Sequence, residues 1–129
     1  MLLERATMWK WSRIAISGSL LVGSATPAVA AAPAKAFIQN YDAAAPTERI
    51  RYELILSDMY EGMGSLNDYL HSIRHEARVF CPPAELVVTG NQLISMVRQF
   101  LRHDPRPGNF PIGVVLLFAI KDVFPCPSQ

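Results

Sequence analysis

Apolar side chains recur every three or four residues in several stretches of this chain, and this spacing predicts helices. The longest predicted helix runs from about Thr47 to His71, with Thr47 as its cap and Glu48 complementing the helix dipole. Gly62 and Gly64 interrupt it, and each costs about 1 kcal/mol relative to alanine in a helix interior. Either packing or a kink explains the glycines, or the segment breaks into two helices near Gly64. The apolar stripe comprises Tyr52, Ile55, Met59, Met63, Leu66, Leu70 and Ile73.

A second predicted helix has the clearest start signal in the chain. Thr89-Gly90-Asn91-Gln92 matches the capping box, in which the Thr89 and Gln92 side chains each satisfy a free backbone amide. Arg98 and Arg102 share the side opposite to the apolar positions, so this helix is amphipathic. The apolar positions follow the helical period: Leu93, Met96, Val97, Phe100 and Leu101.

A last helix is predicted over about residues 111–124, with Pro111 in its first turn and Asn109 as a candidate cap. It is apolar nearly all round, because every residue from Val114 to Ile120 is apolar. Such a segment is buried either inside the bundle or partly against a second subunit. The valines make a strand the competing interpretation, but the length and the charged residues that follow favour a helix. The apolar run of roughly 11 residues is too short to cross a membrane.

The remaining segments connect these helices. Residues 31–46 are rich in alanine, and we predict a short helix over about Pro33 to Tyr41 followed by a linker at 42–46. Pro82 and Pro83 exclude a helix through their position. Residues 47–129 then form one helical domain. The predicted fold class is all-α, a small bundle of about four helices packed around one core.

The first 30 residues have the pattern of a secretion signal. Lys10 and Arg13 supply positive charge, an apolar run covers residues 14–22, and Ala28-Val29-Ala30 offers a cleavage pattern of small residues. Cleavage after Ala30 predicts an exported, periplasmic protein. An uncleaved membrane anchor is the alternative, but the apolar run is shorter than the roughly 18–20 residues that a bilayer crossing needs.

Removal of the signal changes the composition of the chain. Translation starts either at Met1 or at Met8, because Glu4 is out of place in a basic leader. Cleavage after Ala30 leaves 99 residues with nine basic and ten acidic side chains, and both tryptophans are lost. This size suits one domain. The near-neutral charge argues against nucleic acid or an anionic membrane as the main partner, because both require a basic surface.

The only two cysteines stand beside prolines at the two ends of the helical hairpin, in Cys81-Pro82-Pro83 and in Phe124-Pro125-Cys126-Pro127. An antiparallel hairpin brings the two sulfurs together, and export permits a disulfide between Cys81 and Cys126. Closing a loop of about 45 residues contributes roughly 4 kcal/mol in the loop-entropy model. The alternative is a pair of unbonded buried thiols. A redox role has less support, because the chain has no C-x-x-C motif.

Two pairs of side chains have spacings that suit a metal site or acid–base catalysis. His71 and His75 could hold a metal from one helix face, but solvated histidines that cap the last helical carbonyls are the favoured explanation. Asp58 and Glu61 could act as paired carboxylates, whereas the solvated side of the long helix is the simpler explanation. The chain has no nucleophile elbow and no phosphate-binding glycine loop. We therefore predict no catalytic residue, no metal, no cofactor and no enzymatic activity.

The polar turn between the last two helices is the candidate partner-binding element. It has the sequence His103-Asp104-Pro105-Arg106-Pro107-Gly108, and its prolines lower the entropy cost of binding through it. We expect His103, Asp104 and Arg106 to contact a protein partner. A plain connector between two helices would also explain the turn.

The C-terminal half of the chain resembles the Tai-type immunity domain. The resemblance covers about Val79 to Pro127 and lies in Phe80-Cys81-x-Pro83, the capped helix from Gln92 to Leu101, His103-Asp104-Pro105, and the closing segment from Ala119 to Phe124-Pro125-Cys126. Members of this family are periplasmic proteins that protect a bacterium from peptidoglycan amidases delivered by type VI secretion. The resemblance implies an all-helical fold, a clamping disulfide, often a homodimer, and inhibition by plugging the amidase cleft. Family members commonly carry another cysteine pair in the N-terminal helices, whereas this chain has no cysteine before Cys81.

These observations predict an exported, immunity-type binding protein that inhibits a peptidoglycan amidase by occluding its active-site cleft. The alternative is a small periplasmic helical chaperone or stress protein without a toxin partner. Such a chaperone would expose apolar surface, for example residues 114–120, when a dimer dissociates in acid.

Overall fold

The computed structural model describes residues 31–127, so the predicted signal at 1–30 and its cleavage site lie outside the described residues. Four α-helices and one short 3-10 helix follow in order: α1 (Ala34–Ala43), α2 (Pro46–Ser72), α3 (Gly90–His103), η2 (Arg106–Asn109) and α4 (Ile112–Val123). The described part of the chain contains no strand, only an isolated bridge between Pro33 and Pro111. The predicted all-α bundle is therefore confirmed.

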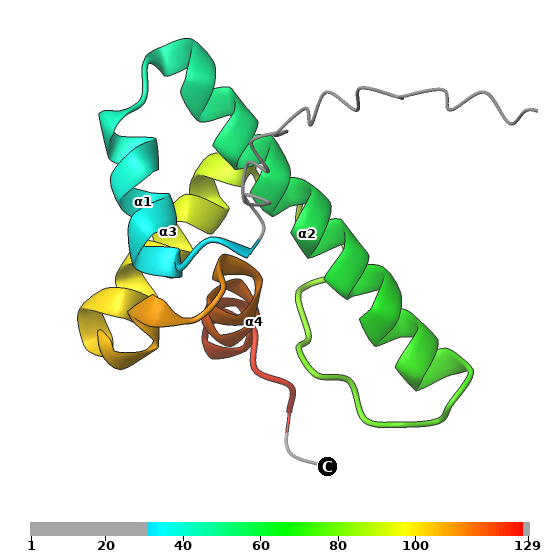
Figure 1. Cartoon of the computed structure of the whole chain (residues 1–129). Helices are drawn as coiled ribbons and strands as arrows, with labels where there is room; N and C mark the ends of the chain where they lie inside the picture. The colour runs from blue at the N-terminus through cyan, green and yellow to red at the C-terminus, as the bar shows by residue number, and fades with distance from the viewer. Residues whose placement is uncertain (1–30, 128–129) are drawn as a thin grey trace, which may run out of the picture.

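The long helix α2 organises the molecule. Helices α1, α3 and α4 gather against its N-terminal part, whereas its C-terminal part extends beyond them, with the loop after it running back alongside (Figure 1). None of the helices in the described residues is long and apolar enough to span a membrane. All four helices and the loop share one buried core, formed by Ala34, Phe37, Tyr41, Leu56, Phe80, Leu93, Ile94, Val97, Ile112, Val115, Leu116, Ala119 and Ile120.

Helix α1 packs against the rest of the bundle. Phe37 is buried, and its ring meets the ring of Tyr52 edge-on with centroids 5.1 Å apart. Arg49 ties the end of α1 to α2, because its guanidinium donates to the carbonyls of Tyr41, Asp42 and Ala44 at 3.2, 2.9 and 3.1 Å. The predicted linker is thus shortened to a tight turn between the two helices.

Helix α2 is continuous from Pro46 to Ser72, so the predicted long helix is confirmed and the alternative of a break near Gly64 does not occur. A Cβ atom built on Gly62 or on Gly64 meets nothing within 4 Å, so packing among the described residues does not require either glycine. The predicted cap at Thr47 is wrong. Ala45 occupies the N-cap position and Pro46 begins the helix, because the fixed φ of proline suits the first helical position.

Helix α3 begins as predicted, with a capping box. The Gln92 amide donates to the Thr89 hydroxyl at 3.3 Å, and the Thr89 amide donates to Oε1 of Gln92 at 2.8 Å. This start packs closely on α2, because a Cβ atom on Gly90 would lie 2.6 Å from both Cβ and the carbonyl oxygen of Glu53. A glycine at the first helical position lets the two helices approach.

Helix α4 is a helix and not a strand, as predicted, but Asn109 does not cap it. Asn109 belongs to η2, and Pro111 takes the N-cap position without a side-chain cap. Backbone hydrogen bonds join this start to the segment before α1: the Ala34 amide donates to the Phe110 carbonyl, and the Ile112 amide to the Ala32 carbonyl, both at 2.9 Å. One side of α4 lies in the core, while Val114 and Phe118 on the other side remain 40% and 37% exposed.

Candidate functional site

A disulfide joins Cys81 to Cys126, as predicted. The two Cα atoms are 4.9 Å apart, and the bridge spans 45 residues of sequence. The Cys81 amide also donates to the Phe124 carbonyl at 2.9 Å. The clamp therefore fixes the loop before α3 to the segment after α4. Bridged sulfurs have no thiolate to act as a nucleophile.

The same loop is held to α2 by Asn67, which the sequence analysis missed. The Asn67 side chain is buried, donates to the Phe80 carbonyl at 2.9 Å and accepts from the Val79 amide at 2.7 Å. Both hydrogen bonds pair a side-chain amide with backbone groups that would otherwise be buried without partners. The available signal was the position of Asn67 on the inward side of α2, about one helical turn after Met63 and two turns after Tyr60.

A groove of about 350 Å³ lies between α2 and this loop. Arg78 and Asp68 form an ion pair of 3.4 Å beside it, and burial raises the pKa of Tyr60 on its α2 side. Gly64 also faces the groove and leaves it open on that side. Its lining mixes charged, aromatic and proline side chains, including Tyr60, Glu61, Asn67, Asp68, Arg78, Phe80, Pro82 and Pro83.

The turn between α3 and α4 is built around Asp104 and Arg106. The Arg106 guanidinium donates to both carboxylate oxygens of Asp104, at 2.8 and 2.7 Å, and the Arg106 amide donates to Oδ1 at 3.1 Å. The hydrogen bonds from Arg106 lower the pKa of Asp104, and the bond to Asp104 raises the pKa of Arg106. His103 does not join them, because its Nδ1 lies 2.9 Å from the carbonyl of Gln99 in its own helix.

This turn is docked on α1 and is not held only by the two helices that it connects. Pro107 and Gly108 are buried, and a Cβ atom on Gly108 would lie 3.5 Å from Cβ of Lys35. The Arg106 side chain nevertheless stays 87% exposed. The turn precedes α4 and the segment that carries Cys126 follows it, so the two lie at opposite ends of this helix. The structure thus offers one fixed, exposed guanidinium at this end of the bundle.

The two histidines considered as metal ligands lie where α2 ends. Nδ1 of His71 is 3.3 Å from the Glu76 carbonyl, and His75 has a φ of 57° in the turn that follows the helix. Within residues 31–127 no group of three or more histidine, cysteine, aspartate or glutamate side chains is placed to hold a metal ion. Asp58 and Glu61 are both exposed on α2.

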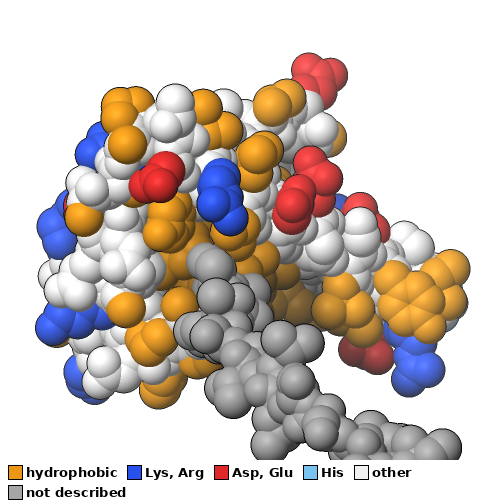
Figure 2. Space-filling model, turned by 45° about the horizontal axis from the view of Figure 1, so that its top comes forward, with side chains coloured by type: hydrophobic (Ala, Val, Ile, Leu, Met, Phe, Trp, Pro, Cys, Tyr) orange, Lys and Arg blue, Asp and Glu red, His pale blue; other side chains and the backbone are white. Residues whose placement is uncertain are grey.

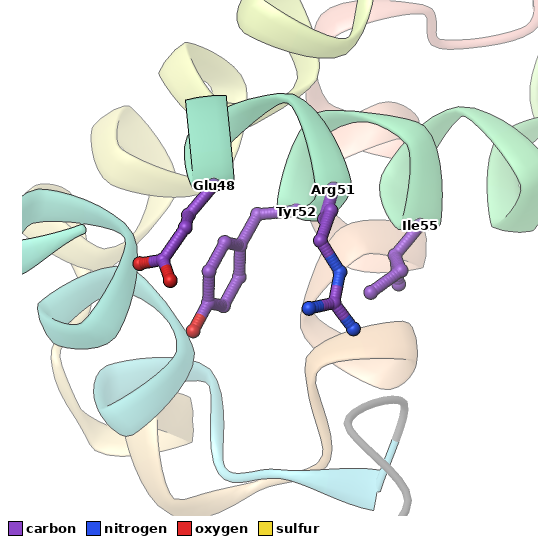
Figure 3. A pocket seen from close by; sticks show the side chains of 4 residues that line it. All are labelled: Glu48, Arg51, Tyr52 and Ile55. Carbon is purple, nitrogen blue, oxygen red and sulfur yellow. The ribbon is translucent and has the colours of Figure 1, made fainter. Parts of the chain in front are cut away.

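A smaller pocket of about 100 Å³ opens near the start of α2 (Figure 3). Glu48, Arg51, Tyr52 and Ile55 line it, and their side chains extend from α2 toward the same side. Its two charged residues have opposite signs, so it presents no net charge to a ligand. We assign it no chemistry.

Apolar side chains are exposed at several places, and two groups of them lie on α4 and on α2. One group lies on the outer side of α4, where Phe110 is 50% exposed and continues the surface of Val114 and Phe118. The other lies at the projecting end of α2, where Figure 2 shows hydrophobic side chains gathered. There Leu66, Tyr69 and Ile73 are 57%, 50% and 64% exposed.

A scan against protein-family models and searches of curated proteins and solved structures found no match to this chain. The class of this protein is therefore defined by its fold and its disulfide alone. It is a small all-α domain clamped by one disulfide. Its function has to be argued from its surfaces.

Proposed function

We propose that this chain is an exported, immunity-type binding protein that inhibits a peptidoglycan amidase by occluding its active-site cleft. The observation that supports this proposal most is the turn between α3 and α4. It is fixed in place by the Asp104–Arg106 pair and by docking on α1, and it presents an 87% exposed Arg106 side chain. A preformed element of this kind enters a cleft with little further loss of conformational entropy.

The chemistry of Arg106 suits the centre of a protein interface. Arginine is enriched among residues that dominate binding energy, and its planar guanidinium recognises a carboxylate or carbonyl with several donors. The pairing with Asp104 holds the guanidinium in one orientation, so a partner does not have to order it. The resemblance of residues 79–127 to the Tai-type domain supplies the class of target. The near-neutral charge of residues 31–129 agrees with a protein partner and not with nucleic acid.

The test is inhibition of a candidate amidase, chosen as a cysteine–histidine peptidoglycan amidase encoded beside this gene. We expect the oxidised protein to inhibit hydrolysis of peptidoglycan and to protect a deletion strain exposed to the enzyme. Arg106→Ala should weaken inhibition by about tenfold or more, which is the loss expected at an interface anchor. Arg102→Ala is the matched control, because it removes the same charge from an exposed position of α3.

Two results would contradict this proposal. One is equal survival of wild-type and deletion strains when they face the amidase. The other is equal inhibition by Arg106→Ala and the parent protein, which would remove the turn from the interface.

A second candidate, a periplasmic chaperone or stress protein, is favoured by the exposed apolar side chains of α2 and α4. It predicts that the protein suppresses aggregation of an unfolded client protein only at low pH, where a dimer dissociates. An oligomeric state that stays unchanged from pH 7 to pH 3 would count against it.

A further inference from the structure

The groove between α2 and the loop that follows it has the size of a ligand site. Its volume of about 350 Å³ lies within the roughly 300–1,000 Å³ that is typical of ligand pockets. The α2 wall is formed by positions 60, 61, 64, 67 and 68, which share one face of the helix. The opposite wall is formed by residues of the loop between 78 and 86. Because Gly64 has no side chain, the groove reaches the backbone of α2.

Both walls of the groove are held in place by the fold. Asn67 binds the loop through the Val79 amide and the Phe80 carbonyl, at 2.7 and 2.9 Å. Phe80 precedes Cys81, whose bridge to Cys126 ties this part of the loop to the segment after α4. A ligand therefore does not have to order the walls when it binds, which lowers the entropy cost of binding.

Aromatic and proline side chains form the apolar part of the lining. Tyr60 on α2 and Phe80 on the loop both line the groove, and their ring centroids are 6.3 Å apart. Pro82 and Pro83 add rigid apolar surface on the loop side. Aromatic rings attract cations, and they also pack against aliphatic groups. This lining suits a side chain that has an apolar stem and a positively charged head.

The charges of the groove favour a cation as well. Its lining contains two carboxylates, Glu61 and Asp68, and one guanidinium, Arg78, which pairs with Asp68 at 3.4 Å. None of the ion pairs among residues 31–127 includes Glu61. Two more exposed acidic residues lie close in the sequence, Asp58 on α2 and Glu85 between two lining residues of the loop. A positively charged ligand is therefore complementary to the groove, and Glu61 is the carboxylate available to it.

We propose that the groove binds an arginine side chain from an extended segment of a protein partner. The guanidinium pairs with the Glu61 carboxylate, and the aliphatic stem lies along Tyr60 and Phe80. Arginine is favoured over lysine because its planar guanidinium stacks on an aromatic ring and donates two hydrogen bonds to one carboxylate. An acidic segment is disfavoured, because its charge would meet the negative charge of the groove.

The surface beside the groove favours a protein segment over a small free cation. Leu86 lines the groove and is 44% exposed, and the adjacent Val87 is 81% exposed. Residues on either side of the bound arginine can cover this apolar surface, whereas a small cation leaves it in water.

The groove is separate from the turn at Arg106, because no residue of η2 lines it. The two sites therefore succeed or fail independently. An amidase that is not inhibited leaves the groove proposal intact, and a groove that binds no arginine leaves the amidase proposal intact.

Binding of a blocked tripeptide, alanine–arginine–alanine, to the oxidised protein tests the proposal. Proton–nitrogen correlation NMR follows the backbone amides of Gly64 and Phe80 and the side-chain amide of Asn67 while the peptide is added. We expect these signals to shift together with a Kd on the order of 1 mM, as suits one side chain that pairs with an exposed carboxylate. The same peptide with citrulline in place of arginine is the control probe, because citrulline has nearly the same shape and no charge. It should bind about threefold more weakly or worse.

Two pairs of variants locate the bound arginine. Glu61→Gln should weaken binding by about threefold or more, whereas Asp58→Asn, which removes an exposed carboxylate of α2 outside the groove, should change it by less than about twofold. Gly64→Leu should fill the groove and abolish binding. Gly62→Leu is its matched control, because Gly62 is equally unhindered but does not line the groove. Circular dichroism should show unchanged helix content in all four variants.

Several results would overturn the proposal. Equal binding of the arginine and citrulline peptides would remove the charge from the recognition. Equal binding by Glu61→Gln and the parent, or shifts that persist in Gly64→Leu, would place the peptide elsewhere on the surface. Groove signals that do not move at about 10 mM peptide, which is about ten times the expected Kd, would show that the groove takes no arginine.

Discussion

Two glycines of this chain show that the cost of adding a side chain depends on its surroundings. Gly90→Ala would place a Cβ atom 2.6 Å from backbone and side-chain atoms of Glu53, so α3 would have to move away from α2. We expect this change to lower the free energy of unfolding by about 1–3 kcal/mol, as overpacking does. Gly64→Ala meets no atom and should raise it by up to about 1 kcal/mol. Urea unfolding of both variants checks this, and equal effects of the same sign would contradict it.

Tyr41 links stability to alkaline pH. The pKa of its phenol is raised, first by the 2.7 Å hydrogen bond that it donates to Glu53 and then by burial. A group with a raised pKa in the folded state contributes stability that is complete below its unfolded pKa, about 10, and is lost as the pH rises through the folded pKa. Stability should therefore fall above about pH 10, and less so in Tyr41→Phe.

Absorbance of tyrosinate at alkaline pH measures this effect directly. The chain has four tyrosines, and Tyr41 and Tyr60 have raised pKa values. We expect these two to ionise after an ordinary tyrosine does, with Tyr41→Phe removing one of the late titrations. A titration in which all four ionise together at the ordinary value would contradict this account.

At the scale of elements, local patterns predicted the helices well. Periodicity placed the long helix over about 47–71, close to the observed Pro46–Ser72, and the capping box placed the start of α3. Helical periodicity and the capping box both depend on residues that lie close together in the sequence. The cap at Thr47 was wrong because Pro46 at the preceding position begins the helix first. The alternative of a break near Gly64 does not occur, because glycine weakens a helix without forbidding it.

The groove and its support could not be predicted in the same way. Asn67 binds Val79 and Phe80, which follow it by 12 and 13 residues in a loop without periodicity. The ion pair between Arg78 and Asp68 also joins this loop to α2, so helical periodicity could not predict it either. In the turn, by contrast, Asp104 and Arg106 are two residues apart, and their sequence neighbourhood was enough to mark them as one candidate site. His103 was marked with them, but its ring lies against its own helix.

Asn67→Leu tests the support of the loop. The substitution keeps a buried side chain of similar size but leaves the Val79 amide and the Phe80 carbonyl without partners. Each unsatisfied buried group costs about 1–3 kcal/mol, so we expect a loss of about 2–4 kcal/mol in the free energy of unfolding. Hydrogen exchange at the Val79 amide should become faster by at least the factor that corresponds to this loss of free energy. A loss below about 0.5 kcal/mol, typical of a surface substitution, would show that Asn67 is not the support.

The whole molecule has one core and one covalent clamp. The clamp closes a 45-residue loop that contains α3, η2 and the whole of α4. Reduction, or Cys81→Ser combined with Cys126→Ser, should therefore lower the free energy of unfolding by about 4 kcal/mol. That is a large share of the roughly 5–15 kcal/mol that a domain has. Unchanged denaturation midpoints for oxidised and reduced protein would show that the bridge is dispensable.

The most direct measurement for the central claim, an exported domain closed by Cys81–Cys126, is the intact mass of the protein from a periplasmic extract, after alkylation without reductant. We predict a chain that starts at Ala31 and carries no alkyl group, and that gains two alkyl groups once it is reduced first. A chain that keeps residues 1–30, with both cysteines alkylated before reduction, would contradict the claim.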